Sequence, residues 1–138
     1  ENYLKAKDFF QLSLNKWKEL NNKSKIIKVL SWLSLSLLET ENESSKSQII
    51  LDFDKRFNGS FIYEEDRIAI NWNAFKIYSS MGDDLRSKTP LQSAYNEIMK
   101  RASLFELEEN RQSYIENIRM NQDIINTWEK INSQKTPS

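Results

Sequence analysis

The side chains of this chain that could do chemistry are its carboxylates, because the sequence contains no histidine and no cysteine. That absence excludes Ser-His and Cys-His mechanisms, imidazole acid–base catalysis, Cys/His metal sites and disulfides within the chain. The two glycines, Gly59 and Gly82, are too far apart to form a glycine-rich phosphate loop. Two carboxylate arrangements remain, the pair Asp52 and Asp54 and the glutamate Glu97.

Asp52 and Asp54 flank the end of the short apolar segment 48–53, which we expect to be a β-strand. Alternate residues of a strand point to one face, so the two carboxylates would form a pair of the kind that holds Mg²⁺ or Ca²⁺. The neighbouring Lys55 and Arg56 can neutralise both charges instead. The pair is therefore compatible with a carboxylate-dependent hydrolase or with ordinary surface ion pairs.

Glu97 lies in the pentad Asn96-Glu97-Ile98-Met99-Lys100, which resembles the H-E-x-x-H motif of the zincin-type metallopeptidases, with Asn96 and Lys100 in place of both zinc histidines. The expected order of elements is also similar to that family, with a small sheet that ends in a strand at 67–72, a loop, the motif helix and a further acidic helix. The resemblance implies a general-base position for Glu97. Downstream acids stand where a third ligand would be sought: Glu108, Glu109 and Glu116.

The two replacements remove the zinc chemistry. Asn96 would be a weak neutral ligand, and a protonated Lys100 has three donors and no lone pair. The resemblance therefore implies a peptidase-like scaffold without its metal, in which Lys100 supplies the positive charge. The alternative is that Glu97 and Arg101 form an i,i+4 ion pair on an exposed helix face, which contributes about 0.3–0.5 kcal/mol. In both cases we expect no metal and no cofactor.

Charge is balanced overall but uneven along the chain. The 20 Lys and Arg residues equal the 20 Asp and Glu residues, whereas duplex-binding proteins carry a basic excess. Residues 1–28 hold seven lysines and three acids, and residues 39–66 hold eight acids and three bases. This asymmetry indicates either two solvated faces or a polarised surface that orients a partner. The lysines around Trp17 also suggest, as a second alternative, binding of single-stranded nucleic acid: Lys16, Lys18, Lys23, Lys25 and Lys28.

We expect an α+β fold that is mainly helical, with about four to five helices and a small antiparallel sheet or hairpin at residues 48–72. The short apolar runs in that region, the Asn58-Gly59 dipeptide and the polar stretch Glu64-Glu65-Asp66 predict one or two hairpins. Apolar residues at helical spacing predict helices at 3–20 and 25–39, with a polar loop over 39–47.

The C-terminal part is predicted to be helical. Thr89-Pro90-Leu91-Gln92 has the composition of a capped helix start, with Pro90 at the first helical position. A further helical pattern runs to about Ile131. We expect residues 1–133 to form a single domain and 134–138 to fray.

A neutral, aromatic-rich domain of this composition is better suited to recognition than to catalysis, so we expect a non-enzymatic protein-interaction module. It could be an inhibitor, an immunity-type protein or a regulatory partner of another protein. No apolar run approaches the roughly 18–20 residues that span a bilayer, which favours a cytoplasmic location, although an upstream segment could have been removed before Glu1. The predicted contact surface combines two acidic stretches: Glu64, Glu65 and Asp66 with Asp83, Asp84 and Arg86.

Overall fold

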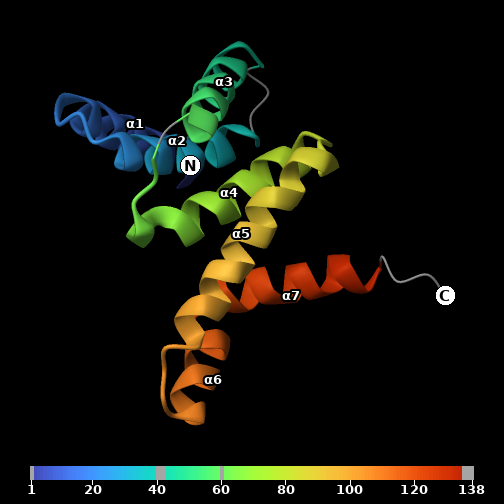
Figure 1. Cartoon of the computed structure of the whole chain (residues 1–138). Helices are drawn as coiled ribbons and strands as arrows, with labels where there is room; N and C mark the ends of the chain where they lie inside the picture. The colour runs from blue at the N-terminus through green and yellow to red at the C-terminus, as the bar shows by residue number, and fades with distance from the viewer. Residues whose placement is uncertain (1, 40–42, 60, 135–138) are drawn as a thin grey trace.

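The computed structural model describes residues 2–39, 43–59 and 61–134, and most of these residues are in helices joined by short turns (Figure 1). The elements in these ranges are α1 (Asn2–Glu19), α2 (Lys23–Leu37), α3 (Glu43–Gly59), the 3-10 helix η1 (Glu64–Asp66), α4 (Arg67–Ser80), α5 (Asp84–Ala102), α6 (Glu108–Glu116) and α7 (Arg119–Ser133). The helices predicted at 3–20 and 25–39 are thus confirmed as α1 and α2. Among the described residues there is no helix long and apolar enough to cross a membrane.

The predicted α+β fold is wrong, because no described residue within 48–72 is in a β-strand. The segment that was expected to begin the sheet belongs to α3, where Ile50, Phe53 and Phe57 follow one another at helical spacing and turn toward the same core. The segment 48–53 is by itself too short to show this helical spacing. Asn58-Gly59 ends this helix and does not form a hairpin turn.

The second expected strand, 67–72, is the first half of α4, and its alternating apolar pattern has a simple cause. Ile70 and Ile77 of α4 pack into one hydrophobic core, whereas Ile68 and Phe75 pack into another. A helix that is buried on two sides carries two apolar stripes, and their overlap imitates the period of a strand. The burial of α4 on two sides therefore explains why residues 67–72 were predicted to be a β-strand.

Helix α4 is shared by two hydrophobic cores. The first core combines α1, α2, α3 and α4, with Leu30, Leu33 and Phe53 fully enclosed. The second combines α4, α5 and α7, with Ile98 and Ile124 fully enclosed. Figure 1 shows the consequence: α4 and α5 cross the middle of the molecule, α1 to α3 gather at one end, and α6 lies at the other.

Helix α5 begins earlier than its sequence predicts. Its N-cap is Asp83, whose side chain accepts a hydrogen bond from the backbone N–H of Arg86 at 3.1 Å. Gly82, with φ of +76°, makes the tight reversal from α4. Thr89 therefore does not cap this helix, and Pro90 lies inside it. The proline is tolerated at this position because it removes only one backbone hydrogen bond, near the start of the helix, and because its ring is buried in the protein.

Two of the predicted segments fall partly outside the described residues. Within the predicted polar loop 39–47, residues 40–42 are not described, and 43–47 belong to α3. Within the predicted tail 134–138, only Gln134 is described. The assignment of residues 1–133 to one domain stays a prediction.

Candidate functional site

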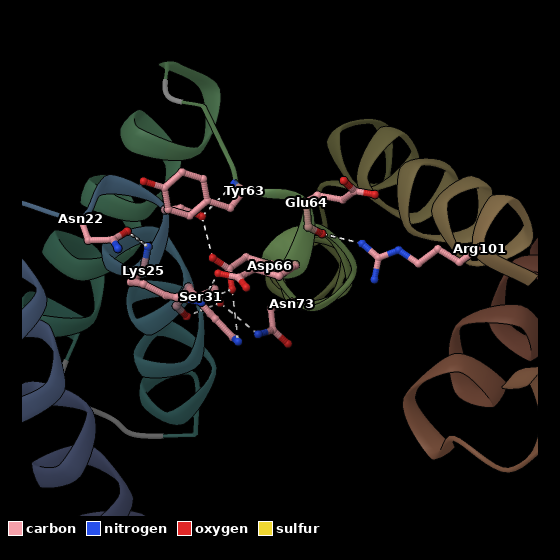
Figure 2. Close-up of polar contacts among 11 residues, drawn as sticks. Asn22, Lys25, Ser31, Tyr63, Glu64, Asp66, Asn73 and Arg101 are labelled. Atoms are coloured by element: carbon pink, nitrogen blue, oxygen red, sulfur yellow. Dashed lines mark hydrogen bonds and ion pairs between the residues drawn. The ribbon is translucent and has the colours of Figure 1, made fainter. Parts of the chain in front are cut away.

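Asp66, at the end of η1, is fully buried and is held by α2. Its carboxylate accepts a hydrogen bond from the Ser24 hydroxyl at 2.7 Å and contacts the ammonium groups of Lys25 at 2.7 Å and Lys28 at 3.4 Å. The Ser24 hydroxyl also accepts a hydrogen bond from the backbone N–H of Tyr63 at 3.0 Å. Figure 2 shows Lys25, Tyr63 and Asp66 close together at the segment that leads into α4. Asp66 therefore fastens η1 to α2.

The electrostatics of Asp66 fit this structural role. Burial raises the pKa of Asp66, but the hydrogen bonds from Lys25 and Ser24 and the charges of Lys25 and Lys28 outweigh it, so the pKa lies below its ordinary value. The hydrogen bond to Asp66 in turn raises the pKa of Lys25, against the opposing effect of burial. The group is thus an ionised pair at neutral pH. A buried ion pair of this kind is costly to break from one side.

The contact between α2 and α4 continues as a polar seam. About two helical turns beyond the Ser24–Asp66 bond, the Asn73 side chain donates to the Ser31 hydroxyl at 3.0 Å, and both residues are fully buried. Both bonds join residues 42 positions apart. The seam therefore fixes a single register between the two helices, which explains the presence of Ser24 and Ser31 on the apolar face of α2.

On the other side of η1, Glu97 of α5 is held by two arginines. Arg67 approaches it at 3.3 Å and Arg101 at 3.2 Å, and its side chain is 10% exposed. Arg101 also donates to the backbone carbonyl of Glu64, as Figure 2 shows. The predicted i,i+4 pair of Glu97 and Arg101 is confirmed, but it does not lie on an exposed face. It joins α5 to the start of α4 and to η1.

Three residues of the degenerate pentad, Asn96, Glu97 and Lys100, line a shallow pocket. The pocket has a volume of about 370 Å³ and is bordered by Arg67, Asn71, Ser93, Asn96, Glu97 and Lys100. Burial raises the pKa of Glu97, but the hydrogen bonds and charges of Arg101 and Arg67 outweigh it and lower the pKa. A general base at neutral pH works best with a pKa near that pH, so this shift has the wrong sign. Asn96 accepts a hydrogen bond from Gln92 at 2.8 Å.

Asp52 and Asp54 do not converge. They lie on α3, where residues two apart point to nearly opposite sides, and each has its own partner. Asp52 accepts a hydrogen bond from Arg56 at 2.8 Å, which agrees with the ion-pair interpretation. Asp54 accepts from the Tyr78 hydroxyl at 2.5 Å and pairs with Arg86. Within the described residues, no group of three or more acidic side chains is arranged to hold a metal ion.

The Asp54 contact also changes the chemistry of Tyr78. Burial, followed by the hydrogen bond to Asp54, raises the pKa of Tyr78 to about 12. The guanidinium of Arg86 stacks over its ring, 4.5 Å from the centroid. The phenol therefore remains protonated and joins α3 to α4.

The predicted contact surface is divided by the fold. Glu64 and Glu65 are exposed on η1, whereas Asp66 is buried and unavailable to a partner. The other predicted group lies beyond the far end of α4, whose 14 residues span about 20 Å: Asp83, Asp84 and Arg86. The two groups therefore do not form one patch, and Arg86 is already paired with Asp54.

The lysines proposed for nucleic acid are also divided. Lys25 and Lys28 are engaged with Asp66, and Trp17 packs against the first core. Lys16, Lys18 and Lys23 remain exposed. Trp17 therefore does not supply an exposed aromatic ring on which a base could stack.

A groove bordered by α4, α5 and α7 has a volume of about 560 Å³ and is lined by Phe75, Leu91, Trp128 and Ile131, among others. The indole N–H of Trp128 donates to the Gln92 side chain at 2.9 Å, and its ring stacks on Tyr95 at 3.8 Å between centroids. This bond engages Trp128 and Gln92 within the protein, and the lining also includes the charged side chains of Asp84 and Lys88.

A surface that the sequence analysis missed lies at the turn between α5 and α6. We call it the acidic tip and define it by three apolar and three acidic residues: Leu104, Phe105 and Leu107 with Glu106, Glu108 and Glu109. Leu104 is 77% exposed and Leu107 is 57% exposed, and no residue of α6 is buried. Phe105, at 36% exposure, is less exposed than the two leucines. In the sequence, apolar residues continue past Ala102, the last residue of α5, and this run could have indicated the exposed surface.

The acidic tip is an ordered turn. The Arg111 guanidinium donates to the backbone carbonyl of Phe105 at 2.8 Å and pairs with Glu108. The Phe105 ring packs against Tyr114, with 5.3 Å between centroids. Leu104 and Leu107 therefore project from a turn whose Phe105 carbonyl and ring are both in contact with α6.

No protein-family model, curated protein or solved structure is significantly similar to the chain. The functional argument therefore depends on the geometry described above. The resemblance to the zincin-type metallopeptidases stays a prediction, and it rests on the pentad alone because its expected sheet is absent from the described residues.

Proposed function

We propose that this domain is a non-catalytic protein-interaction module and that the acidic tip is its contact surface. The observation that carries the proposal is the exposure of both Leu104 and Leu107 on one ordered turn. An exposed apolar patch with a charged border is typical of a surface that another protein covers. Such a module would serve equally as an inhibitor, an immunity-type protein or a regulatory partner.

The order of the turn supports this assignment. Arg111 and Tyr114 hold the Phe105 backbone and ring, so Leu104 and Leu107 lose little conformational freedom when a partner binds. The carboxylates, in contrast, are engaged inside the protein: Glu97 by two arginines and Asp54 by Tyr78 and Arg86. Recognition is therefore better supported than hydrolysis.

The tip also defines the chemistry of the partner. Glu106, Glu108 and Glu109 surround the leucines, and Arg111 offsets only one of these charges. A complementary surface would present one or two apolar side chains flanked by lysine or arginine. We expect the contact to weaken at high salt, because the charges lie at the solvated border.

The proposal is tested by affinity capture from cells of the source organism, with three forms of the domain as bait. The wild type should retain a partner that the Leu104→Asn/Leu107→Asn variant loses. The matched control is Leu85→Asn, which replaces a leucine of 78% exposure away from the tip. Circular dichroism of each form checks that the helices are intact.

Two results would overturn the proposal. Equal retention of the same partner by the wild type and the tip variant would remove the acidic tip from the contact. Failure of the wild type to retain any protein, including a second copy of itself, would remove the interaction function.

A further inference from the structure

The groove bordered by α4, α5 and α7 is a second surface of the protein, separate from the acidic tip. It lies where α4 ends, α5 begins and α7 ends, whereas the tip follows the last residue of α5 (Figure 1). Its volume of about 560 Å³ lies within the roughly 300–1,000 Å³ that small-molecule sites occupy. The groove is therefore large enough for a small ligand.

Part of the groove is apolar and held in one arrangement. Trp128 is fixed by its stack on Tyr95 and by its hydrogen bond to Gln92. The other apolar side chains of the lining belong to the second core or pack against it: Phe75, Leu91 and Ile131. A ligand would thus meet a preformed apolar surface that loses little conformational freedom on binding.

Two side chains of opposite charge also line the groove. Asp84 and Lys88 lie four residues apart on α5, so they are neighbours on the helix surface, and both are exposed. Neither forms a salt bridge with another residue of the described ranges, and they do not pair with each other. The Thr89 hydroxyl, beside Lys88, likewise has no hydrogen-bond partner among these residues. Both charges can therefore contact a ligand.

The neighbouring charged residues do not alter this balance. Arg86 is paired with Asp54, and Asp83 caps the helix. On α7 the lining residues are at positions 128, 131, 132 and 134, and Glu129 and Lys130 are not among them. The described lining of the groove thus carries one negative and one positive charge.

We infer that the groove binds a small zwitterion of the α-amino-acid type with an apolar side chain. The ligand ammonium pairs with the Asp84 carboxylate, and the ligand carboxylate accepts from the Lys88 ammonium and the Thr89 hydroxyl. The ligand side chain packs against Phe75 and Trp128. An α-amino acid holds both charges on one carbon, beside its side chain, which matches two adjacent opposite charges next to an apolar surface.

The charges of the groove favour a zwitterion over a ligand with a single charge. A simple carboxylic acid would gain the contact with Lys88 but would place its own charge beside the Asp84 carboxylate. A simple amine would gain the contact with Asp84 but would meet the Lys88 ammonium. Like charges that face each other across a contact disfavour binding, so each of these ligands should bind more weakly than the amino acid.

A purely structural role for Asp84 and Lys88 makes different predictions. An acid in the first turn of a helix and an acid–lysine pair four residues apart both stabilise a helix. If the two residues served only α5, a salt bridge between them would be expected, and the structure does not show one. Such a role also predicts that their replacement leaves the affinity for a ligand unchanged.

The inference is tested by isothermal titration calorimetry of the whole domain with L-phenylalanine and L-leucine. L-phenylalanine should bind with a dissociation constant of about 1 mM or below, as is usual for so small a ligand. Hydrocinnamate, which lacks the ammonium, and phenethylamine, which lacks the carboxylate, should each bind at least about fivefold more weakly. The chemical shift of the Trp128 indole N–H, followed by NMR, should change on binding and locate the ligand in the groove.

Two variants assign the charges of the ligand to the two residues. Asp84→Asn should weaken binding of L-phenylalanine by about fivefold and abolish its advantage over hydrocinnamate. Lys88→Gln should weaken it by a similar factor and abolish its advantage over phenethylamine. This crossed pattern measures each pairwise contact, because each variant removes one protein charge and each analogue removes one ligand charge.

Matched controls separate the groove from an effect of net charge. Asp123→Asn and Lys100→Gln make the same changes of charge at exposed residues of α7 and α5 outside the lining. Both should bind L-phenylalanine like the wild type. Asp84 and Lys88 are themselves exposed, so their variants should keep the helices, which circular dichroism checks.

Several outcomes would overturn the inference. Absence of binding by both amino acids at about ten times the expected dissociation constant would exclude the site, whereas the capture experiment judges the acidic tip separately. Equal affinity for L-phenylalanine and either analogue would exclude recognition of a zwitterion. Undiminished binding by Asp84→Asn or Lys88→Gln, or an unchanged Trp128 signal at saturation, would place the ligand elsewhere.

Discussion

The segment η1 and the acidic tip reverse the usual placement of residue types. In η1, the carboxylate of Asp66 is fully buried and bound by Ser24 and two lysines. At the tip, Leu104 and Leu107 are exposed. Both segments are short connections beside a helix start, and both are rich in acidic residues.

The comparison teaches that contacts within the fold, and not residue types, decide which side chains stabilise this protein and which remain exposed. Asp66 satisfies its charge within the fold, so it stabilises the protein and offers nothing to a partner. The leucines at the tip contribute little apolar burial to the fold, so their exposed area is available for binding. If the comparison is right, substitutions in the two segments should affect different measurements.

The largest effect on stability is expected for Asp66→Ala. This change leaves Lys25 and Lys28 without their buried partner and Ser24 without its acceptor, which should lower the free energy of unfolding by about 3 kcal/mol. Urea denaturation followed by circular dichroism measures it. The control is Glu65→Ala, whose carboxylate is 3.2 Å from Lys25 but largely exposed, so its change should stay below about 1 kcal/mol. Similar losses for both variants would break the comparison.

A smaller and pH-dependent effect is expected for Glu97→Gln. The pKa of Glu97 lies below its ordinary 4.5 in the folded protein, so its charge stabilises the fold above that value and ceases to do so as pH falls through the folded pKa. At neutral pH the variant should lose about 1–2 kcal/mol of unfolding free energy. Urea denaturation at neutral and acid pH should show the two proteins converging in acid. A difference that is independent of pH would exclude the charge as the cause.

The smallest effect on stability is expected at the tip. Leu104→Asn/Leu107→Asn should change the free energy of unfolding by no more than about 0.5 kcal/mol, as is usual for exposed positions. The same denaturation measurement applies, with Leu91→Ala as a control at a buried leucine of the second core. A tip variant that destabilised the protein by several times this amount would mean that the leucines pack in the fold, and the tip would no longer differ from η1.

The sequence was a sound guide to the elements whose environment is simple. Helices α1 and α2 were predicted because each carries one dominant apolar stripe against one core. The Glu97–Arg101 pair was also predictable, since residues four apart on a helix are neighbours. These features depend on residues close together in the chain.

The features that were missed depend on contacts between distant residues. The two cores that share α4 gave its sequence the alternation of a strand, and the buried partners of Asp66 come from α2, about 40 residues earlier. Thr89-Pro90 has the composition of a helix start, but α5 already begins after its N-cap, Asp83. The acidic tip was missed because the apolar run past α5 does not by itself show whether Leu104 is buried or exposed, which depends on packing by other elements.

The sharing of α4 between both cores has a consequence for how the protein unfolds. Loss of the first core would strip Ile70 and Ile77 of their neighbours, and loss of the second would do the same to Ile68 and Phe75 on the same helix. A helix of 14 residues is marginal in water without such packing. Neither end of the molecule can therefore open far without weakening the other, and native-state hydrogen exchange across α4 should report the global free energy of unfolding.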